Sequence, residues 1–155
     1  MTFSSKTLQF VGLHVILPVG IGAMLYLLWR SPTLLVFTWA RSVGLIAVVQ
    51  TLRELAAGWN SLLFPSLLYS LPDGLWVYSM TTCMLLIWND FPLSVYKVLW
   101  VSSATILACA AEGLQFFGIC PGTYDSTDVV MSLLAAVLAL LLGSRSLSFA
   151  KRRCT

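Results

Sequence analysis

The chain has 155 residues, of which 59% are hydrophobic and 10% are charged. Ordinary soluble domains carry about a quarter charged residues, so this composition excludes a soluble domain and predicts a small polytopic membrane protein. The formal net charge of +3 is too small for nucleic-acid binding, and the four cysteines show no CxxC or Cys/His spacing that would predict a metal site or a disulfide framework.

The first apolar stretch, residues 9–29, is long enough to cross a hydrocarbon core, which takes about 20 residues. No small-residue cleavage site follows it, so we expect an uncleaved anchor and not a signal peptide. Pro18, Gly20 and Gly22 predict a bent helix that packs closely against a neighbour. For His14, the only histidine, we favour a hydrogen-bonded residue near the membrane interface over a proton relay.

Residues 33–52 form a second apolar stretch, which carries Arg41 near its middle. Arginine at the centre of a membrane helix costs about 2.5–3.5 kcal/mol. An interfacial or re-entrant helix avoids this cost, and we favour it over a further full span. Residues 53–70 follow as an amphipathic connector that begins with Arg53.

Three further spans are predicted at residues 71–88, 95–117 and 127–142. Pro72 and Asp73, near the start of the first of these, are typical of the first turn of a helix. The predicted fold is therefore an all-α polytopic bundle of four transmembrane helices plus one interfacial or re-entrant helix, in a single integral membrane domain over residues 1–155. Five transmembrane helices is the alternative. Tryptophans at span ends, as in an aromatic belt, agree with these spans: Trp29, Trp76, Trp88 and Trp100.

The orientation of the spans is predicted by the basic C-terminal cluster Lys151, Arg152 and Arg153. Basic residues that flank a span stay in the cytoplasm, so we expect a multi-pass protein of the cell membrane with a cytoplasmic C-terminus and membrane lipid as its surroundings. The hairpin at 117–127 and the segment 71–76 then share the outer face. This placement holds for four spans and for five.

The acidic residues gather at that outer face. Glu112 and Gln115 end one span, and Asp125 and Asp128 open the next, after a short turn that makes the two helices antiparallel neighbours. A carboxylate at the rim of a membrane helix is costly, so it usually has a partner or a function. Each of these helices also carries a stripe at helical spacing, and we expect the two stripes to face each other. The stripes comprise Ser102, Thr105, Cys109 and Glu112 in the first helix, and Asp128, Ser132, Ala135, Ala139 and Gly143 in the second.

Helix capping offers a structural explanation for some of these acids. It would account for Asp125 and Asp128 as well as a functional role does, and it is favoured for Asp73. It cannot account for Glu112, which lies toward the C-terminal end of its helix, where the helix dipole disfavours an acid. We expect Glu112 either to carry a proton or to pair with a donor. The donors considered are Gln115, Arg41 and Arg53.

In these residues the chain resembles the VanZ-like family of small bacterial membrane proteins. The resemblance lies in Glu112-x-x-Gln115, in the turn Pro121-Gly122-Thr123-Tyr124-Asp125, in Asp128 and in the final span rich in small residues. It covers about the last third of the chain, and the segment Leu71-Pro72-Asp73-Gly74-Leu75-Trp76 agrees with some small members. Many members have asparagine and glycine in the last span and an arginine in the turn, which this chain lacks.

The resemblance implies a role in the cell envelope, because the family takes its name from low-level resistance to teicoplanin. We expect a polar pocket at the outer face that binds an envelope precursor, a lipid headgroup or a glycopeptide, without a cofactor or metal. A non-enzymatic assembly subunit and an intramembrane enzyme with paired carboxylates are the alternatives; no catalytic motif favours an enzyme. The candidate site residues are Glu112, Gln115, Asp125, Asp128, Asp73, Trp76, Arg41 and Arg53.

Overall fold

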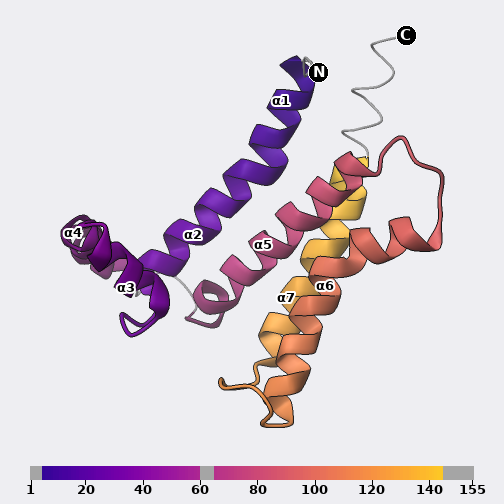
Figure 1. The fold of residues 1–155 in the computed structure, drawn as a ribbon. Coiled ribbons are helices and arrows are strands. Elements are labelled where there is room, and N and C mark those ends of the chain that lie inside the picture. Colours follow the sequence, from indigo (N-terminus) through magenta and orange to yellow (C-terminus); the bar gives the residue numbers. More distant parts are fainter. Residues whose placement is uncertain (1–4, 60–64, 145–155) are drawn as a thin grey trace.

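A computed structural model describes residues 5–59 and 65–144, and this part of the chain is helical with no β-strand. Three of its helical segments are long and apolar enough to cross a membrane: Ser5–Trp29, Val95–Phe116 and Ser126–Gly143. The all-α prediction is confirmed. Figure 1 shows that the long helices run up and down past one another, with two short helices to one side.

The first long segment is one continuous rod made of α1 (Ser5–Val11), a π-helical turn (Gly12–Ile16) and α2 (Leu17–Trp29). The π turn lies directly before Pro18. Proline has no N–H to donate to the carbonyl four residues earlier, so a wider turn at this point lets the helix continue. His14 lies in this turn, and its Nδ1 is 2.7 Å from the hydroxyl oxygen of Tyr78, as expected for a hydrogen-bonded histidine.

Residues 33–52 do not form the single helix that we predicted. They contribute α3 (Leu35–Ser42) and the beginning of α4 (Ile46–Ala56), and a short 3-10 turn (Ala57–Trp59) follows. The break occurs at Gly44, which has a φ of +74°, a conformation that glycine adopts without steric cost. Helices of 8 and 11 residues are each shorter than the roughly 20 residues that a span requires.

The central helix, α5 (Pro65–Ile87), begins two turns earlier than predicted. Pro72 therefore lies inside the helix and not in its first turn, and Asp73 does not occupy the helix-start position that we favoured for it. Pro65, the first residue of α5, holds the N-terminal position that suits proline. Inside a bundle, neighbouring helices can compensate for the backbone hydrogen bond that Pro72 cannot make.

The hairpin consists of α6 (Val95–Phe116) and α7 (Ser126–Leu138), which continues as a π-helical turn (Ala139–Gly143). Both helices begin with a side-chain cap, as the sequence suggested for the second: the Ser94 hydroxyl accepts from the N–H of Lys97 at 3.3 Å, and the Asp125 carboxylate accepts from the N–H of Thr127 at 2.8 Å. The hairpin places the end of α6 and the start of α7 together (Figure 1).

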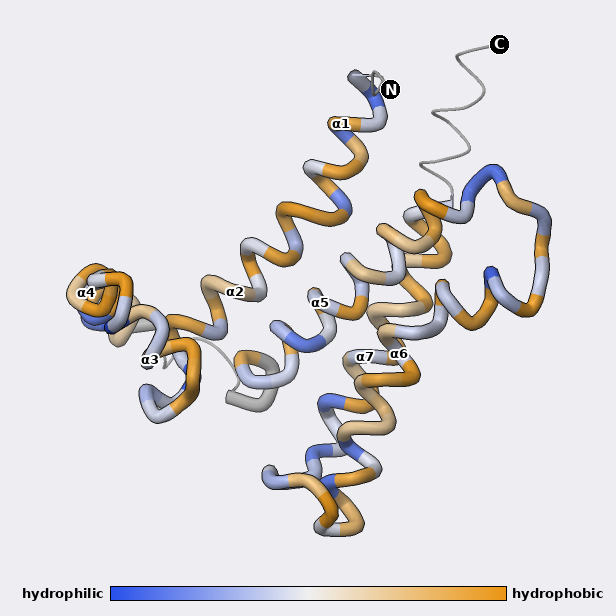
Figure 2. The backbone as a smooth tube through the Cα atoms, viewed as in Figure 1, coloured by the Kyte–Doolittle hydropathy of each residue, from blue (hydrophilic) through white to orange (hydrophobic). Residues whose placement is uncertain are grey.

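The core lies where α5, α6 and α7 meet, around Val77, Ala104 and Ala135. α5 also buries four hydroxyl residues: Ser70, Ser79, Thr81 and Thr82. These polar side chains lower the hydropathy of α5, which is not among the three segments apolar enough to span, although it has 23 residues. Figure 2 shows hydrophilic and hydrophobic residues along α5, with a hydrophilic stretch in its first half.

Beyond Asp128, the residues of the small-residue stripe of α7 are buried. We predicted that this stripe faces α6, but α7 packs more extensively against α5 than against α6. Close contacts at glycine accompany the packing of α7 on α5. Gly74 of α5 lies directly against Met131 of α7, and Gly143 lies against Thr82 and Leu85 of α5. Glycine on one helix lets the partner backbone approach closely, and α5 offers a glycine at the facing position.

We predict that Gly74→Leu destabilises the bundle by about 1–3 kcal/mol, the usual cost of overpacking a tight contact. A Cβ atom at this position would already lie 3.4 Å from the carbonyl oxygen of Met131, and a leucine side chain would separate α5 from α7. Gly20→Leu is the matched control, because nothing lies within 4 Å of its Cβ position. Thermal unfolding of both variants in detergent measures the effect, and equal stabilities would contradict the packing of α5 on α7.

Candidate functional site

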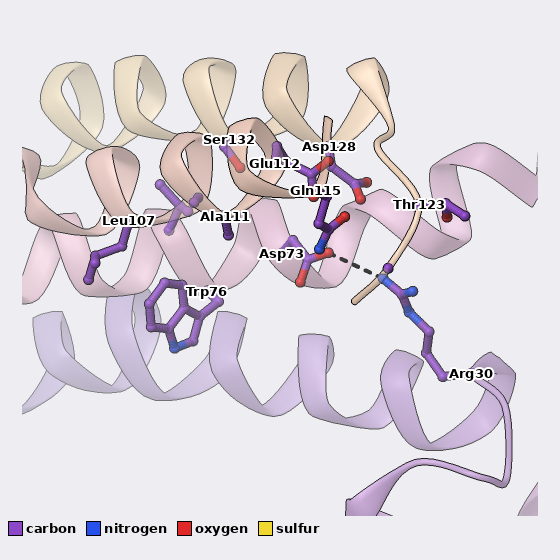
Figure 3. Close-up of a pocket in the computed structure, with 13 residues that line it drawn as sticks. Arg30, Asp73, Trp76, Leu107, Ala111, Glu112, Gln115, Thr123, Asp128 and Ser132 are labelled. Carbon is purple, nitrogen blue, oxygen red and sulfur yellow. Dashed lines mark hydrogen bonds and ion pairs between the residues drawn. The ribbon is translucent and has the colours of Figure 1, made fainter. Parts of the chain in front are cut away.

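A cavity of about 510 Å³ lies at the end of the bundle where α2 ends, α5 and α7 begin and α6 ends. α5, α6 and α7 contribute to its lining together with Arg30, which follows α2, and Figure 3 shows Glu112, Gln115 and Asp128 together, with Asp73 facing them. Its size falls within the roughly 300–1,000 Å³ typical of small-ligand pockets. Its lining residues are Arg30, Asp73, Trp76, Val77, Leu107, Ala108, Ala111, Glu112, Gln115, Gly122, Thr123, Asp128 and Ser132.

An ion pair crosses the mouth of the cavity. The Nη2 atom of Arg30, which follows the last residue of α2, lies 3.3 Å from Oδ2 of Asp73 and also donates to the carbonyl oxygen of Tyr69 at 3.0 Å. The guanidinium lies over the rings of Tyr26 and Tyr69, with its carbon 5.5 Å and 5.6 Å from their centroids. These contacts fix the end of α2 to the first turns of α5, because each one constrains the same planar group.

Arg53 supports this arrangement from outside the cavity. Its Nη1 donates to the carbonyl oxygens of Leu27 and Arg30, at 2.8 Å and 2.9 Å. These carbonyls belong to the C-terminal end of α2, where a helix has acceptors without intrahelical donors and a partial negative charge. The guanidinium also lies 5.2 Å from the ring centroid of Phe37, which is buried. Arg53 therefore ties α3 and α4 to the helix end that carries Arg30.

The turn between α6 and α7 is closed by Glu112. Its Oε2 accepts a hydrogen bond of 3.0 Å from the backbone N–H of Asp125. This partner was not among the three donors that we expected for Glu112, because the sequence does not show where a backbone N–H will lie. The carboxylate of Asp125 in turn accepts from the N–H of Thr127, and this hydrogen bonding lowers the pKa of Asp125 below its ordinary value.

Gln115 is covered by the same turn. Gly122 has a φ of +136°, and a Cβ at this position would lie 2.8 Å from the amide carbon of Gln115. A side chain at position 122 would therefore meet both backbone strain and the Gln115 amide. The close approach holds one wall of the cavity in place, with Gly122 and Thr123 on one side and Gln115 on the other.

Asp128 lies in the first turn of α7, partly buried in the cavity wall. Its Oδ1 is inaccessible and has no hydrogen-bond partner among the described residues. A buried acceptor without a donor costs about 1–3 kcal/mol, and more when it is charged. Of the two roles considered for the acidic pair, capping thus belongs to Asp125, while Asp128 is left with an unused acceptor beside the cavity.

Five of the eight predicted site residues line this cavity: Glu112, Gln115, Asp128, Asp73 and Trp76. Asp125 is the helix cap next to it and reaches it only through its backbone bond to Glu112. Arg53 acts behind it on the end of α2. Arg41 is exposed on α3 and is not part of the lining.

Sequence reasoning missed Arg30, the cation that lines the cavity. The first predicted span ends at residue 29, directly before Arg30, and we assigned Arg30 no role. The sequence could have indicated Arg30, because a four-span arrangement places the end of the first span on the same side of the membrane as Asp73. An arginine and an aspartate at the same rim of a membrane bundle are expected to pair, since either charge alone would be costly there.

The described residues contain no group of three or more His, Cys, Asp or Glu side chains positioned to hold a metal ion. The cavity can instead present carboxylates, one guanidinium and one amide to a ligand. Comparisons with protein families, with curated proteins and with solved structures find no match to this chain. Its function is therefore argued from the cavity and from the sequence resemblance.

We predict that Arg30 and Asp73 are energetically coupled. A double-mutant cycle with Arg30→Gln and Asp73→Asn, measured by unfolding in detergent, should give an interaction of about 0.5 kcal/mol or more, as found for residues in contact. Arg41→Gln combined with Asp73→Asn is the matched control, and its effects should add. Additivity in the Arg30 cycle would show that the ion pair does not hold α2 to α5.

Proposed function

We propose that this protein is a VanZ-like membrane protein of the cell envelope. Its cavity would bind the headgroup of an envelope precursor at the outer face of the cytoplasmic membrane. The observation that carries this proposal is the convergence on one cavity of charged side chains from α5, α6, α7 and the residue that follows α2. These side chains are far apart in the sequence, yet all of them line the cavity: Arg30, Asp73, Glu112 and Asp128. Ionisable residues inside a membrane bundle are by default candidates for a functional site.

The proposed topology has four spans, with the cavity outside and the C-terminus in the cytoplasm. The Ser5–Trp29 rod, α5, α6 and α7 alternate in direction, as consecutive spans must (Figure 1). The hydroxyl residues of α5 lower its hydropathy, but they are buried, so they do not have to face lipid. The short helices α3 and α4 would lie at the outer interface, where Arg41 can remain hydrated.

The lining favours a ligand that carries amino and hydroxyl groups. It contains three carboxylates and one guanidinium, and the guanidinium is already paired with Asp73. The excess of negative charge and the free acceptor of Asp128 suit an ammonium or hydroxyl donor, since hydrogen bonds to charged groups are about twice as strong as neutral ones. Arg41, which would have favoured a phosphate, lies outside the lining.

A second candidate is the assembly subunit whose acidic residues stabilise helix packing. The bond between Glu112 and the N–H of Asp125 favours it, because this bond closes the hairpin without any ligand. Binding and architecture predict different outcomes for a conservative substitution. Loss of a site removes activity from a protein that still inserts, whereas loss of architecture removes the protein itself.

For the topology, we predict that a membrane-impermeant thiol reagent labels Cys120 on intact cells and labels Cys154 only after permeabilisation. Cys120 lies in the turn before α7, and Cys154 belongs to the basic tail, outside the described residues. The measurement uses single-cysteine variants, with the other cysteines replaced by serine. Labelling of Cys154 but not Cys120 on intact cells would reverse the proposed orientation.

For the function, we predict that expression in a glycopeptide-sensitive Gram-positive host raises teicoplanin tolerance, and that Glu112→Gln and Asp128→Asn each abolish the rise. Both substitutions remove a carboxylate charge from the cavity while nearly preserving shape. Glu54→Gln, at an exposed position of α4, is the matched control and should behave as wild type. Membrane levels of every variant are measured in parallel.

The outcomes separate the candidates. Loss of tolerance at unchanged protein level supports the binding site, and loss of the protein itself supports the assembly subunit. If wild-type protein inserts and tolerance does not change, the resistance role is wrong.

A further inference from the structure

We infer that the ligand of this cavity is amphipathic, and that its hydrocarbon chain lies in a groove between α2 and the start of α5. The inference rests on the proposed headgroup site and specifies what is attached to the headgroup. A second hollow of about 320 Å³ adjoins the polar cavity and shares two of its lining residues, Asp73 and Trp76. A ligand can therefore occupy both hollows without crossing a helix.

The groove has the composition expected for an alkyl chain. Val19, Ala23, Tyr26 and Leu27 line its α2 side, and they recur at the three- and four-residue spacing that forms one face of a helix. From Leu27 to Val19 the helix rises about 12 Å, at about 1.5 Å per residue, away from the charged end. The groove thus runs from the charged rim into the apolar part of the helix.

The residues at the boundary between the two hollows combine charged and apolar groups. At the rim, Arg30 pairs with Asp73 and covers the ring of Tyr26. Trp76 lies one turn further along α5, where it separates the charged lining from the apolar one and remains 46% exposed (Figure 3). Tryptophan has an apolar body with a polar N–H, and it suits positions where one end of a ligand is polar and the other is not.

The groove is closed on one side because α2 packs closely on α5 there. A Cβ atom on Gly22 would lie 3.4 Å from the carbonyl oxygen of Pro72 and 3.5 Å from Cβ of Leu75. The helices meet at this glycine, while the exposed Ala23 and Val19 leave space beside it. A hydrocarbon chain in this space would contact both helices. Bilayer lipid is also apolar, so the chain gains little by leaving it and specificity must come from the headgroup.

The test uses a long-chain alkyl glucosaminide with a photoreactive diazirine in its chain, in nanodiscs that contain the full protein. Its free amine and hydroxyls match the acidic cavity, and the chain reports its own position by crosslinking. We expect peptide mapping to find adducts on α2 between residues 19 and 27, and excess methyl glucosaminide, which has no chain, to suppress them. The N-acetylated glycolipid, which lacks the positive charge, should label this segment more weakly.

Two matched variants test the groove. Ala23→Phe fills the groove and should reduce groove adducts about tenfold, which corresponds to about 1.4 kcal/mol. Met24→Phe places the same side chain at the next, 57% exposed position outside the lining and should leave labelling unchanged. Asp128→Asn should reduce groove adducts as well, because it weakens the headgroup site that anchors the chain.

Binding of the headgroup and the position of the chain are measured in separate experiments. Binding of methyl glucosaminide is measured by saturation-transfer NMR on the same nanodiscs. If it binds while chain adducts are spread over the lipid-facing helices and ignore Ala23→Phe, the groove inference is overturned and the headgroup site remains. If neither the soluble sugar nor the glycolipid binds, the amine-selective headgroup site fails, and the groove inference fails with it.

Discussion

The close approach of α5 to its neighbours is the constraint on which the rest of the structure depends. Gly22 brings α2 against α5, and Gly74 brings α5 against α7. In a membrane, helix association gains little from the hydrophobic effect, so close van der Waals packing at small residues carries much of the stability. The same contacts place the beginning of α5 between the end of α2 and the beginning of α7, where the charged residues lie.

This packing also determines how the polar residues of α5 are accommodated. Ser79 donates to the carbonyl oxygen of Leu75 at 2.9 Å, and Tyr78 lies within hydrogen-bond distance of His14. A hydroxyl bound to the helix backbone or to a neighbouring helix can be buried at modest cost. The buried hydroxyls of α5 that have no hydrogen-bond partner among the described residues are those of Ser70, Thr81 and Thr82. A helix with this composition is poorly suited to lipid on all sides but well suited to the centre of a bundle. Its low hydropathy and its central position therefore have the same cause.

At the end of the bundle that holds the cavity, the charged groups have different structural roles. Arg53 and Asp125 stabilise helix ends, Glu112 closes the turn, and Arg30 pairs with Asp73. Each of these contacts satisfies a donor or acceptor whose burial without a partner would be costly. Two buried polar atoms here have no hydrogen-bond partner among the described residues, Nε of Arg30 and Oδ1 of Asp128. The unused acceptor lies in the wall of the cavity, between groups that are already held in place.

The sequence by itself determined the helical class, the hairpin and the end of the bundle at which the acids gather, because these follow from hydropathy, from helix-breaking residues and from chain direction. It also brought together Glu112, Gln115 and Asp128, which line one cavity in the structure. It could not determine that α5 begins at Pro65, which moved Asp73 from a helix start to a pairing position. Whether a helix continues through proline depends on whether neighbouring helices compensate for the backbone hydrogen bond that proline cannot make. The local sequence does not show this.

Only the tertiary structure decided which residues meet across helices. The small-residue stripe of α7 could be identified from the sequence, but not that α7 packs more extensively on α5 than on α6, with Gly74 against Met131. Arg30 lines the cavity and Arg41 does not, although only Arg41 was among the predicted site residues. Glu112 accepts a hydrogen bond from the backbone N–H of Asp125, and the position of this N–H depends on how the turn folds. Rotation of a helix about its axis decides such pairings, and it is set by packing between helices and not by the sequence of either one.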